Sequence, residues 1–215
     1  MNNEDKIDSY KNILKDFIPE KSVDTVANWI IQFHFHLKIT ENRNSKLGDY
    51  RSPTENGVHQ ITVNHNLNKY SFFITLVHEI AHLVTHEQFK KEYRRVKPHG
   101  HEWKRNFKNL IWGFLNEDIF PPEVLYALKG YMNNPAASSC TDADLQRVLK
   151  RYDKNQNKQL LEDLKPNTLF KINGRVFRKG KLLRKRFQCT EIPSNRHYLI
   201  SGIAEVKEID EVIDK

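Results

Sequence analysis

The five residues His78-Glu79-Ile80-Ala81-His82 constrain this chain more than any other stretch. Two histidines four positions apart lie on the same face of an α-helix, with their Cβ atoms about 5–6 Å apart. That separation allows one nitrogen of each imidazole to bind the same Zn²⁺ ion at about 2.0–2.1 Å. Glu79 lies about 100° further round the helix, where it suits a general base acting on a metal-bound water better than a ligand. The pattern therefore predicts a metal-bearing helix.

The residues around this pattern follow helical spacing. An apolar stripe runs between residues 71 and 84, and the two histidines fall nearly opposite it. Its members are Phe73, Leu76, Val77, Ile80 and Val84. Ser71 or Asn68 can cap the start of the helix. We therefore expect a helix that buries one face in a core and presents His78 and His82 to a cleft.

A catalytic zinc site with an open position needs a third protein ligand. The extended pattern H-E-x-x-H-x-x-G-x-x-H is absent, because Thr85 and Gln88 replace its glycine and its last histidine. Downstream, Pro98 and Gly100 predict a turn that could bring a side chain back to the metal. Spacing alone leaves three candidates for the third ligand, which are His99, His101 and Glu102.

The rest of the chain predicts an α+β fold. A small mixed or antiparallel sheet is expected to pack with the metal-bearing helix, followed by further helices and a small C-terminal antiparallel β segment. Strands are expected at 33–39, 47–50 and 58–63, with a turn at Asn56-Gly57, and helices within 5–18, 22–30, 104–116, 121–131 and 141–152. From residue 168 onward, short strands and an Asn173-Gly174 hairpin turn are predicted. The expected domains are 1–135, a helical connector at 136–165, and a basic β domain at 166–215.

Composition bounds the class of protein. The chain has 215 residues, of which 38% are hydrophobic and 29% charged, as in ordinary soluble proteins. No stretch approaches 18 apolar residues and no apolar signal core is present, so we expect a cytoplasmic protein without a membrane partner. Two cysteines, Cys140 and Cys189, are too few for a disulfide framework.

The net charge of +8 is unevenly distributed. Residues 171–190 contain eight lysines and arginines and no acidic residue. Such a cluster suits an anionic partner, most commonly nucleic acid, although a solubilising surface explains it equally well. The candidate nucleic-acid-binding residues are Arg175, Arg178, Lys179, Arg184, Lys185 and Arg186.

The combination of residues 78–82 with His99-Gly100-x-Glu102-Trp103 resembles the SprT-like (Spartan-like) zinc metalloprotease family. Residues 47–51 and 61–64 also resemble the segments that precede the active-site helix in this family. The resemblance covers about residues 20–115 and implies a zincin-like minimal protease fold. It implies that His78, His82 and His99 bind zinc, that Glu79 is the catalytic base, and that the substrate is a protein.

Some relatives of this kind degrade proteins crosslinked to DNA, which makes DNA-associated proteins a candidate substrate. Many members carry a cysteine-rich zinc ribbon that Cys140 and Cys189 alone cannot build, so a DNA-binding role of that ribbon does not transfer. The rival hypothesis is a basic nucleic-acid-binding protein whose zinc site is structural or vestigial. Glu79 favours the enzyme, because a structural site needs no base. His101 and Tyr50 are candidates for an additional oxyanion-stabilising donor.

Overall fold

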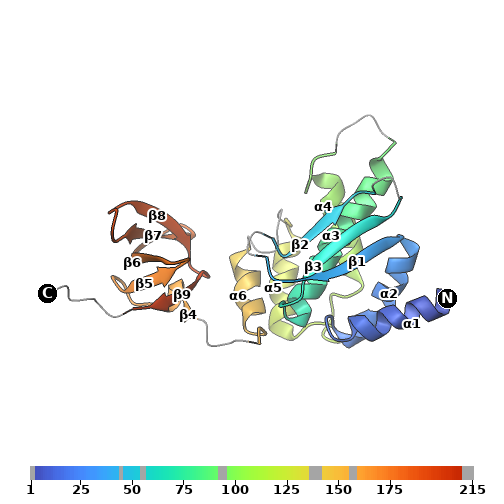
Figure 1. Cartoon of the computed structure of the whole chain (residues 1–215), viewed down its shortest axis with the longest axis horizontal. Coiled ribbons are helices and arrows are strands. Elements are labelled where there is room, and N and C mark those ends of the chain that lie inside the picture. The colour runs from blue at the N-terminus through green and yellow to red at the C-terminus, as the bar shows by residue number, and fades with distance from the viewer. Residues whose placement is uncertain are drawn as a thin grey trace. The chain divides into compact units, whose positions relative to one another are not determined.

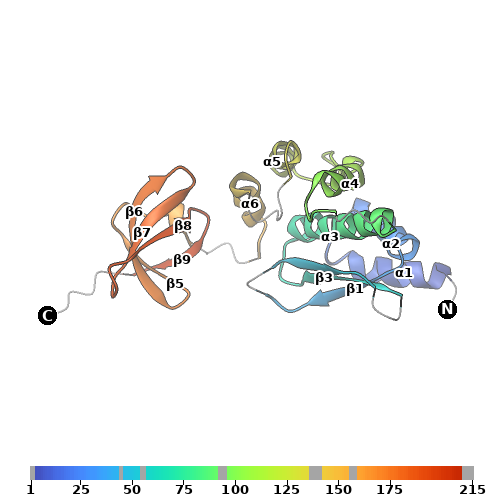
Figure 2. The same ribbon diagram turned by 90° about the horizontal axis from the view of Figure 1, so that it is seen from above.

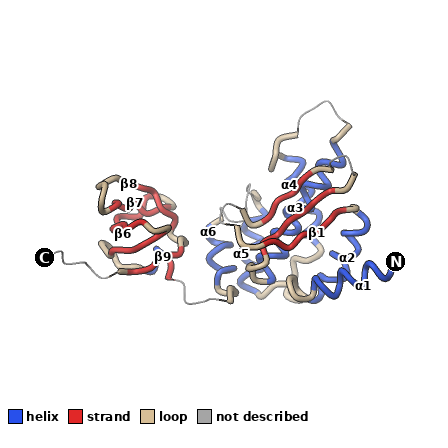
Figure 3. Tube along the Cα trace, in the orientation of Figure 1, coloured by secondary structure: helices blue, strands red, loops and turns tan. Residues whose placement is uncertain are grey.

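The computed structural model describes residues 3–43, 46–53, 57–91, 96–135, 142–154 and 159–209. The chain forms two compact units, residues 1–154 and residues 155–215, and each is described by itself. The described part contains six α-helices and two sheets, which confirms the predicted α+β class (Figure 1; Figure 3). No helix within those ranges is long and apolar enough to cross a membrane. Asn56 and Cys140, named above, fall outside them.

The sheet of the first unit has three strands in the order β1-β3-β2. Strand β1 (Phe35–Thr40) runs parallel to the central strand β3 (His59–Asn64), and the edge strand β2 (Gly48–Arg51) runs antiparallel to it. The sheet is therefore mixed. Strand β1 starts two residues later than the predicted strand, because α2 (Val23–Gln32) is followed by a turn in which His34 has a φ of 50°.

The helix α3 (Lys69–Phe89) carries the predicted metal-binding pattern. Of the two predicted caps, Asn68 is the one used, because its side chain accepts hydrogen bonds from the backbone N–H groups of Tyr70 and Ser71. Figure 2 shows α3 between the sheet and α4 (His101–Trp112). Because both sides of α3 are covered, the prediction of one apolar stripe was too narrow, and Phe72 and Ile74 are also fully buried.

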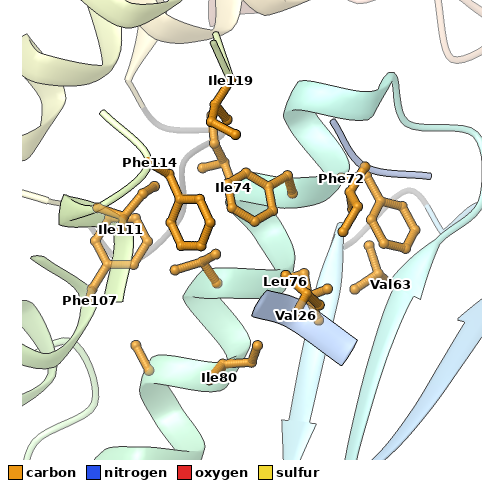
Figure 4. Close-up of a cluster of buried hydrophobic side chains, with 14 of the residues drawn as sticks. Val26, Val63, Phe72, Ile74, Leu76, Ile80, Phe107, Ile111, Phe114 and Ile119 are labelled. Carbon is orange, nitrogen blue, oxygen red and sulfur yellow. The ribbon is translucent and has the colours of Figure 1, made fainter. Parts of the chain in front are cut away.

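The core of the first unit surrounds α3. Figure 4 shows side chains of α2, β3 and α4 packed against it. Those labelled are Val26, Val63, Phe72, Ile74, Leu76, Ile80, Phe107, Ile111, Phe114 and Ile119. The remaining helices of this unit are α1 (Asn3–Leu14), a 3₁₀ turn (Glu20–Ser22), α5 (Pro122–Met132) and α6 (Ala143–Lys150). A rigid, fully packed helix is thus available to hold a site.

Helix α6 belongs to the first unit. Its Leu145 and Leu149 are buried in the same core, and Asn68 Nδ2 donates to the Leu149 carbonyl at 2.9 Å and to Asp153 Oδ1 at 2.7 Å. The boundary between the compact units falls at residues 154 and 155. The predicted domain boundaries at residues 135 and 165 stay a prediction. Helix α6, which lies in the predicted connector, packs on the first unit.

The second unit is a six-stranded antiparallel sheet in the order β4-β9-β5-β6-β7-β8. Its elements are β4 (Gln159–Leu160), a 3₁₀ turn (Leu161–Asp163), β5 (Leu169–Ile172), β6 (Arg175–Leu183), β7 (Arg186–Glu191), β8 (His197–Ser201) and β9 (Glu205–Glu208). Asn173 and Gly174 have φ of 50° and 79°, which confirms the hairpin turn. A separate small core contains Phe170, Phe177 and Cys189.

Candidate metal centre

Three histidines converge, two from α3 and one from the segment just before α4. The Nε2 atom of His99 lies 3.1 Å from that of His78 and 2.8 Å from that of His82, and the His78 and His82 Nε2 atoms are 3.3 Å apart. Two nitrogens bound tetrahedrally to one zinc lie about 3.4 Å apart. Within the described residues, this is the one histidine, cysteine and carboxylate group compact enough to hold a metal. The donor set therefore fits a zinc ion.

His99 reaches the other two because of the turn that precedes α4. His99 has a φ of 57°, and the Gly100 N–H donates to the Lys97 carbonyl at 2.9 Å. A Cβ on Gly100 would lie 2.9 Å from that carbonyl, so the tight turn requires glycine. His101 is exposed at the first position of α4. The structure thus brings His99, and neither His101 nor Glu102, to His78 and His82.

Trp103 forms the wall behind the three imidazoles, a contribution that the sequence analysis did not assign. Its ring centroid lies 4.5 Å from that of His78 and 4.8 Å from that of His99, and the side chain is only 1% exposed. It stacks on Phe107 with an interplanar angle of 6°. This apolar wall excludes water from one side of the centre.

Burial keeps the three imidazoles neutral. It lowers the pKa of His78 to about 2, with smaller contributions from the neighbouring His82 and His99. The pKa of His82 falls to about 4 through burial and then His99, and the pKa of His99 is lowered in the same direction by burial and then Lys104. Neutral imidazole is the form that binds a metal ion. The site therefore holds three nitrogen ligands in their binding form.

Glu79 lies against the edge strand β2 and is 7% exposed. Burial, followed by the charge of Asp49, raises its pKa to about 8, and the Tyr50 backbone N–H opposes this by hydrogen bonding to the carboxylate. A Cβ on Gly48 would lie 2.7 Å from Glu79 Oε1, so β2 can approach the carboxylate only without a side chain there. A carboxyl with this pKa can take up and release a proton near neutral pH.

A second polar chain runs beside the three histidines. The Tyr50 hydroxyl lies 3.0 Å from His59 Nδ1, and His59 Nε2 lies 3.2 Å from Glu87 Oε1. The Tyr50 ring is parallel to that of His82 within 5°, at a centroid distance of 6.4 Å. His59 itself is buried. The Tyr50 hydroxyl is thus engaged by His59, and its predicted use as an oxyanion donor stays a prediction.

The predicted nucleic-acid-binding residues are placed in different surroundings. Arg178 lies exposed on β6, and Arg184, Lys185 and Arg186 are exposed around the β6–β7 turn. Arg175 pairs with Glu191 at 2.6 Å and lies over the Phe177 and Tyr198 rings. Lys179 is buried, and its Nζ donates to the carbonyls of Leu164 and Glu162. We therefore leave Lys179 out of any proposed binding surface.

Comparison with known proteins gives one match. The model of the SprT-like family matches residues 21–114, a segment that extends from the 3₁₀ turn before α2 to just past α4. This segment contains all three converging histidines and Glu79. Neither the search of curated proteins nor the search of solved structures found a match. The match confirms the resemblance that the motifs indicated.

Proposed function

Because residues 21–114 match the SprT-like family, which is associated with metalloprotease-like activity, we propose that this protein is a zinc-dependent endopeptidase with a zincin-like catalytic arrangement. His78, His82 and His99 would hold the zinc, and Glu79 would be the catalytic base. The observation that carries the proposal is the convergence of three histidine Nε2 atoms, those of buried His78 and half-buried His82 and His99, beside a buried carboxyl whose pKa is raised to about 8.

The chain's own residues account for the proton transfers. Zinc in a three-histidine site supplies a Lewis acid that lowers the pKa of a bound water to about 7 and polarises a peptide carbonyl. Glu79 accepts the proton of the attacking water and returns it to the leaving amine. The Tyr50 backbone N–H fixes the carboxylate for both transfers. Trp103 keeps bulk water away from the rear of the centre.

The second candidate function is a basic nucleic-acid-binding protein with a structural or vestigial zinc site. The exposed Arg184, Lys185 and Arg186 favour it. Glu79 argues for the enzyme, since burying a carboxyl is unfavourable and a structural zinc site has no use for one. The two functions are compatible if the substrates are DNA-associated or DNA-crosslinked proteins, and we propose that substrate class on the strength of this charge.

The substitution Glu79→Gln tests the enzyme. We expect it to retain one zinc per chain, measured by mass spectrometry, and to reduce cleavage of an unfolded protein by about 10²–10⁴-fold. Glu117→Gln, at an exposed position of the same unit, is the matched control and should cleave normally. Equal activity of Glu79→Gln and wild type, or no cleavage by the zinc-loaded wild type, would overturn the proposal in favour of the binding protein.

A further inference from the structure

A pocket of about 260 Å³ opens beside His82. Its floor is one face of α3, on which Thr85, His86 and Phe89 follow His82 at helical spacing, together with Lys90 at the C-cap. Its walls come from β2, from the segment that leads to His99, and from α4, through Tyr50, Val96, Lys97, Pro98 and Trp103. The pocket is thus continuous with the three-histidine centre through a residue that belongs to both.

The lining is mainly aromatic and aliphatic. Tyr50, Phe89 and Trp103 contribute rings, and Val96 and Pro98 contribute aliphatic surface. The cation on the floor is already engaged, because Lys90 Nζ lies 2.5 Å from Glu87 Oε2. Lys97 also lines the pocket and could meet an acidic group, whereas an apolar group meets the rings and aliphatic side chains that form most of the walls.

The volume is that of one large side chain. At about 30 Å³ for each water in the liquid, 260 Å³ corresponds to about eight or nine waters. Sites for whole drug-sized ligands measure about 300–1,000 Å³. The Tyr50 wall is held in place, because its hydroxyl lies 3.0 Å from His59 Nδ1 and Glu87 holds the other side of His59. The pocket is therefore small and preformed.

We propose that this pocket is the subsite for a large apolar side chain of the protein substrate, such as leucine, methionine, phenylalanine or tyrosine, next to the scissile bond. The proposal rests on the proposed peptidase function. A carbonyl positioned at the three histidines has its flanking residues one Cα step of about 3.8 Å away. One flanking side chain can therefore enter a pocket that begins at His82. Its fit there would give the enzyme a preference for certain cleavage positions.

The test measures kcat/KM of the zinc-loaded full chain on a peptide series. The peptides differ only at the two positions that flank the cleaved bond, which carry leucine, phenylalanine, alanine, glycine or aspartate. We expect a preference at one of the two positions for leucine or phenylalanine over glycine, of about 10–200-fold. Val96→Trp, which fills the pocket, should remove that preference and leave the glycine peptide unaffected. Phe89→Ala, which enlarges it, should shift the preference toward tryptophan.

Ile13→Trp is the matched control, because it adds the same side chain at an exposed position of α1. Circular dichroism and zinc content establish that each variant is folded. If Val96→Trp does not fold, Phe89→Ala alone tests the subsite. Cleavage without residue preference, or a preference that both pocket variants leave unchanged, overturns the subsite while the peptidase stands. Absence of all cleavage by the zinc-loaded wild type overturns the peptidase, and the subsite with it.

Discussion

Glu79 is positioned by the backbone of β2 as well as by its own helix. The Tyr50 N–H bonds its carboxylate, and the missing side chain of Gly48 leaves room for it. We predict that Gly48→Ala lowers kcat by about 100-fold with little change in KM, because a displacement of about 1 Å in a catalytic group is costly. Zinc content should stay at one per chain. Peptide kinetics and mass spectrometry measure both quantities.

Gly113→Ala is the control for this substitution, because a Cβ at Gly113 meets no atom within 4 Å. It should leave kcat unchanged. A Gly48→Ala variant with wild-type kcat would show that the carboxylate does not depend on β2 for its position. Loss of zinc from that variant would show instead that the strand supports the histidines.

The buried ionisable groups also predict how the stability of the metal-free protein depends on pH. The pKa values of His78 and His82 lie well below the ordinary 6.5, mainly because of burial, so the unfolded chain binds more protons below that pH. Their contribution to the free energy of unfolding is complete above about pH 6.5 and declines as the pH falls toward 4. Glu79 has the opposite effect on the pH dependence of stability. Burial raises its pKa from 4.5 to about 8, so its contribution to the free energy of unfolding is lost as the pH rises through that range.

Glu79→Gln isolates the second effect. We predict that the metal-free variant gains stability relative to the metal-free wild type as the pH rises from 5 to 8, by at most about 1.4 kcal/mol per pH unit. Urea unfolding at each pH measures the difference. Parallel stability curves for the two proteins would mean that Glu79 titrates in the folded protein at its ordinary pKa.

At this scale, part of the centre follows from local rules. His78 and His82 could be paired from the sequence because a spacing of four residues fixes their common helix face. His99 could not be chosen over His101 and Glu102 by spacing, since the choice depends on the left-handed φ of His99 and the bond from Gly100 to Lys97. Trp103 and His59 were missed because their contacts are made only after distant segments pack.

Among the elements, β6 and β7 form a hairpin whose turn carries the densest exposed positive charge of the candidate surface. Arg184, Lys185 and Arg186 are all exposed there. We predict that their replacement by glutamine weakens binding of the full chain to duplex DNA and reduces the slope of log K against log salt by up to about 3. Fluorescence anisotropy with labelled DNA over a salt series measures both.

Replacement of Lys6, Lys15 and Lys38, three exposed lysines of the first unit, removes the same charge and is the matched control. Equal losses from the two triple variants would indicate a general effect of net charge. An unchanged salt slope in the hairpin variant would exclude the hairpin as a DNA contact.

The sequence predicted which segments form helices and strands more accurately than it predicted what packs around them. The Asn173-Gly174 turn and the start of α3 at Asn68 depend on neighbouring residues, and both were found. The burial of Phe72 and Ile74 was not expected, because helical periodicity does not reveal that a second layer covers the opposite side of α3. Similarly, the shortened start of β1 depends on where α2 ends.

For the whole molecule, the two compact units have separate cores, and each contains its own apolar cluster. The sequence indicated the change from helices to short strands, since the periodicity changes near residue 168. It placed α6 in a separate helical connector, because a short amphipathic helix between two domains can pack on either. The buried Leu145 and Leu149 and the bonds of Asn68 show that α6 completes the first unit.

A comparison of two fragments makes this assignment testable. We predict that residues 1–154 fold cooperatively, bind one zinc and cleave unfolded protein as the full chain does, because the core around α3 is complete. Residues 1–135 should be less stable by about 4 kcal/mol or more, since two buried leucines are lost at about 2–5 kcal/mol each and the Asn68 amide loses its partners. Urea unfolding and zinc content distinguish the fragments. Equal stability of the two would place α6 outside the first unit and return it to the role of a connector.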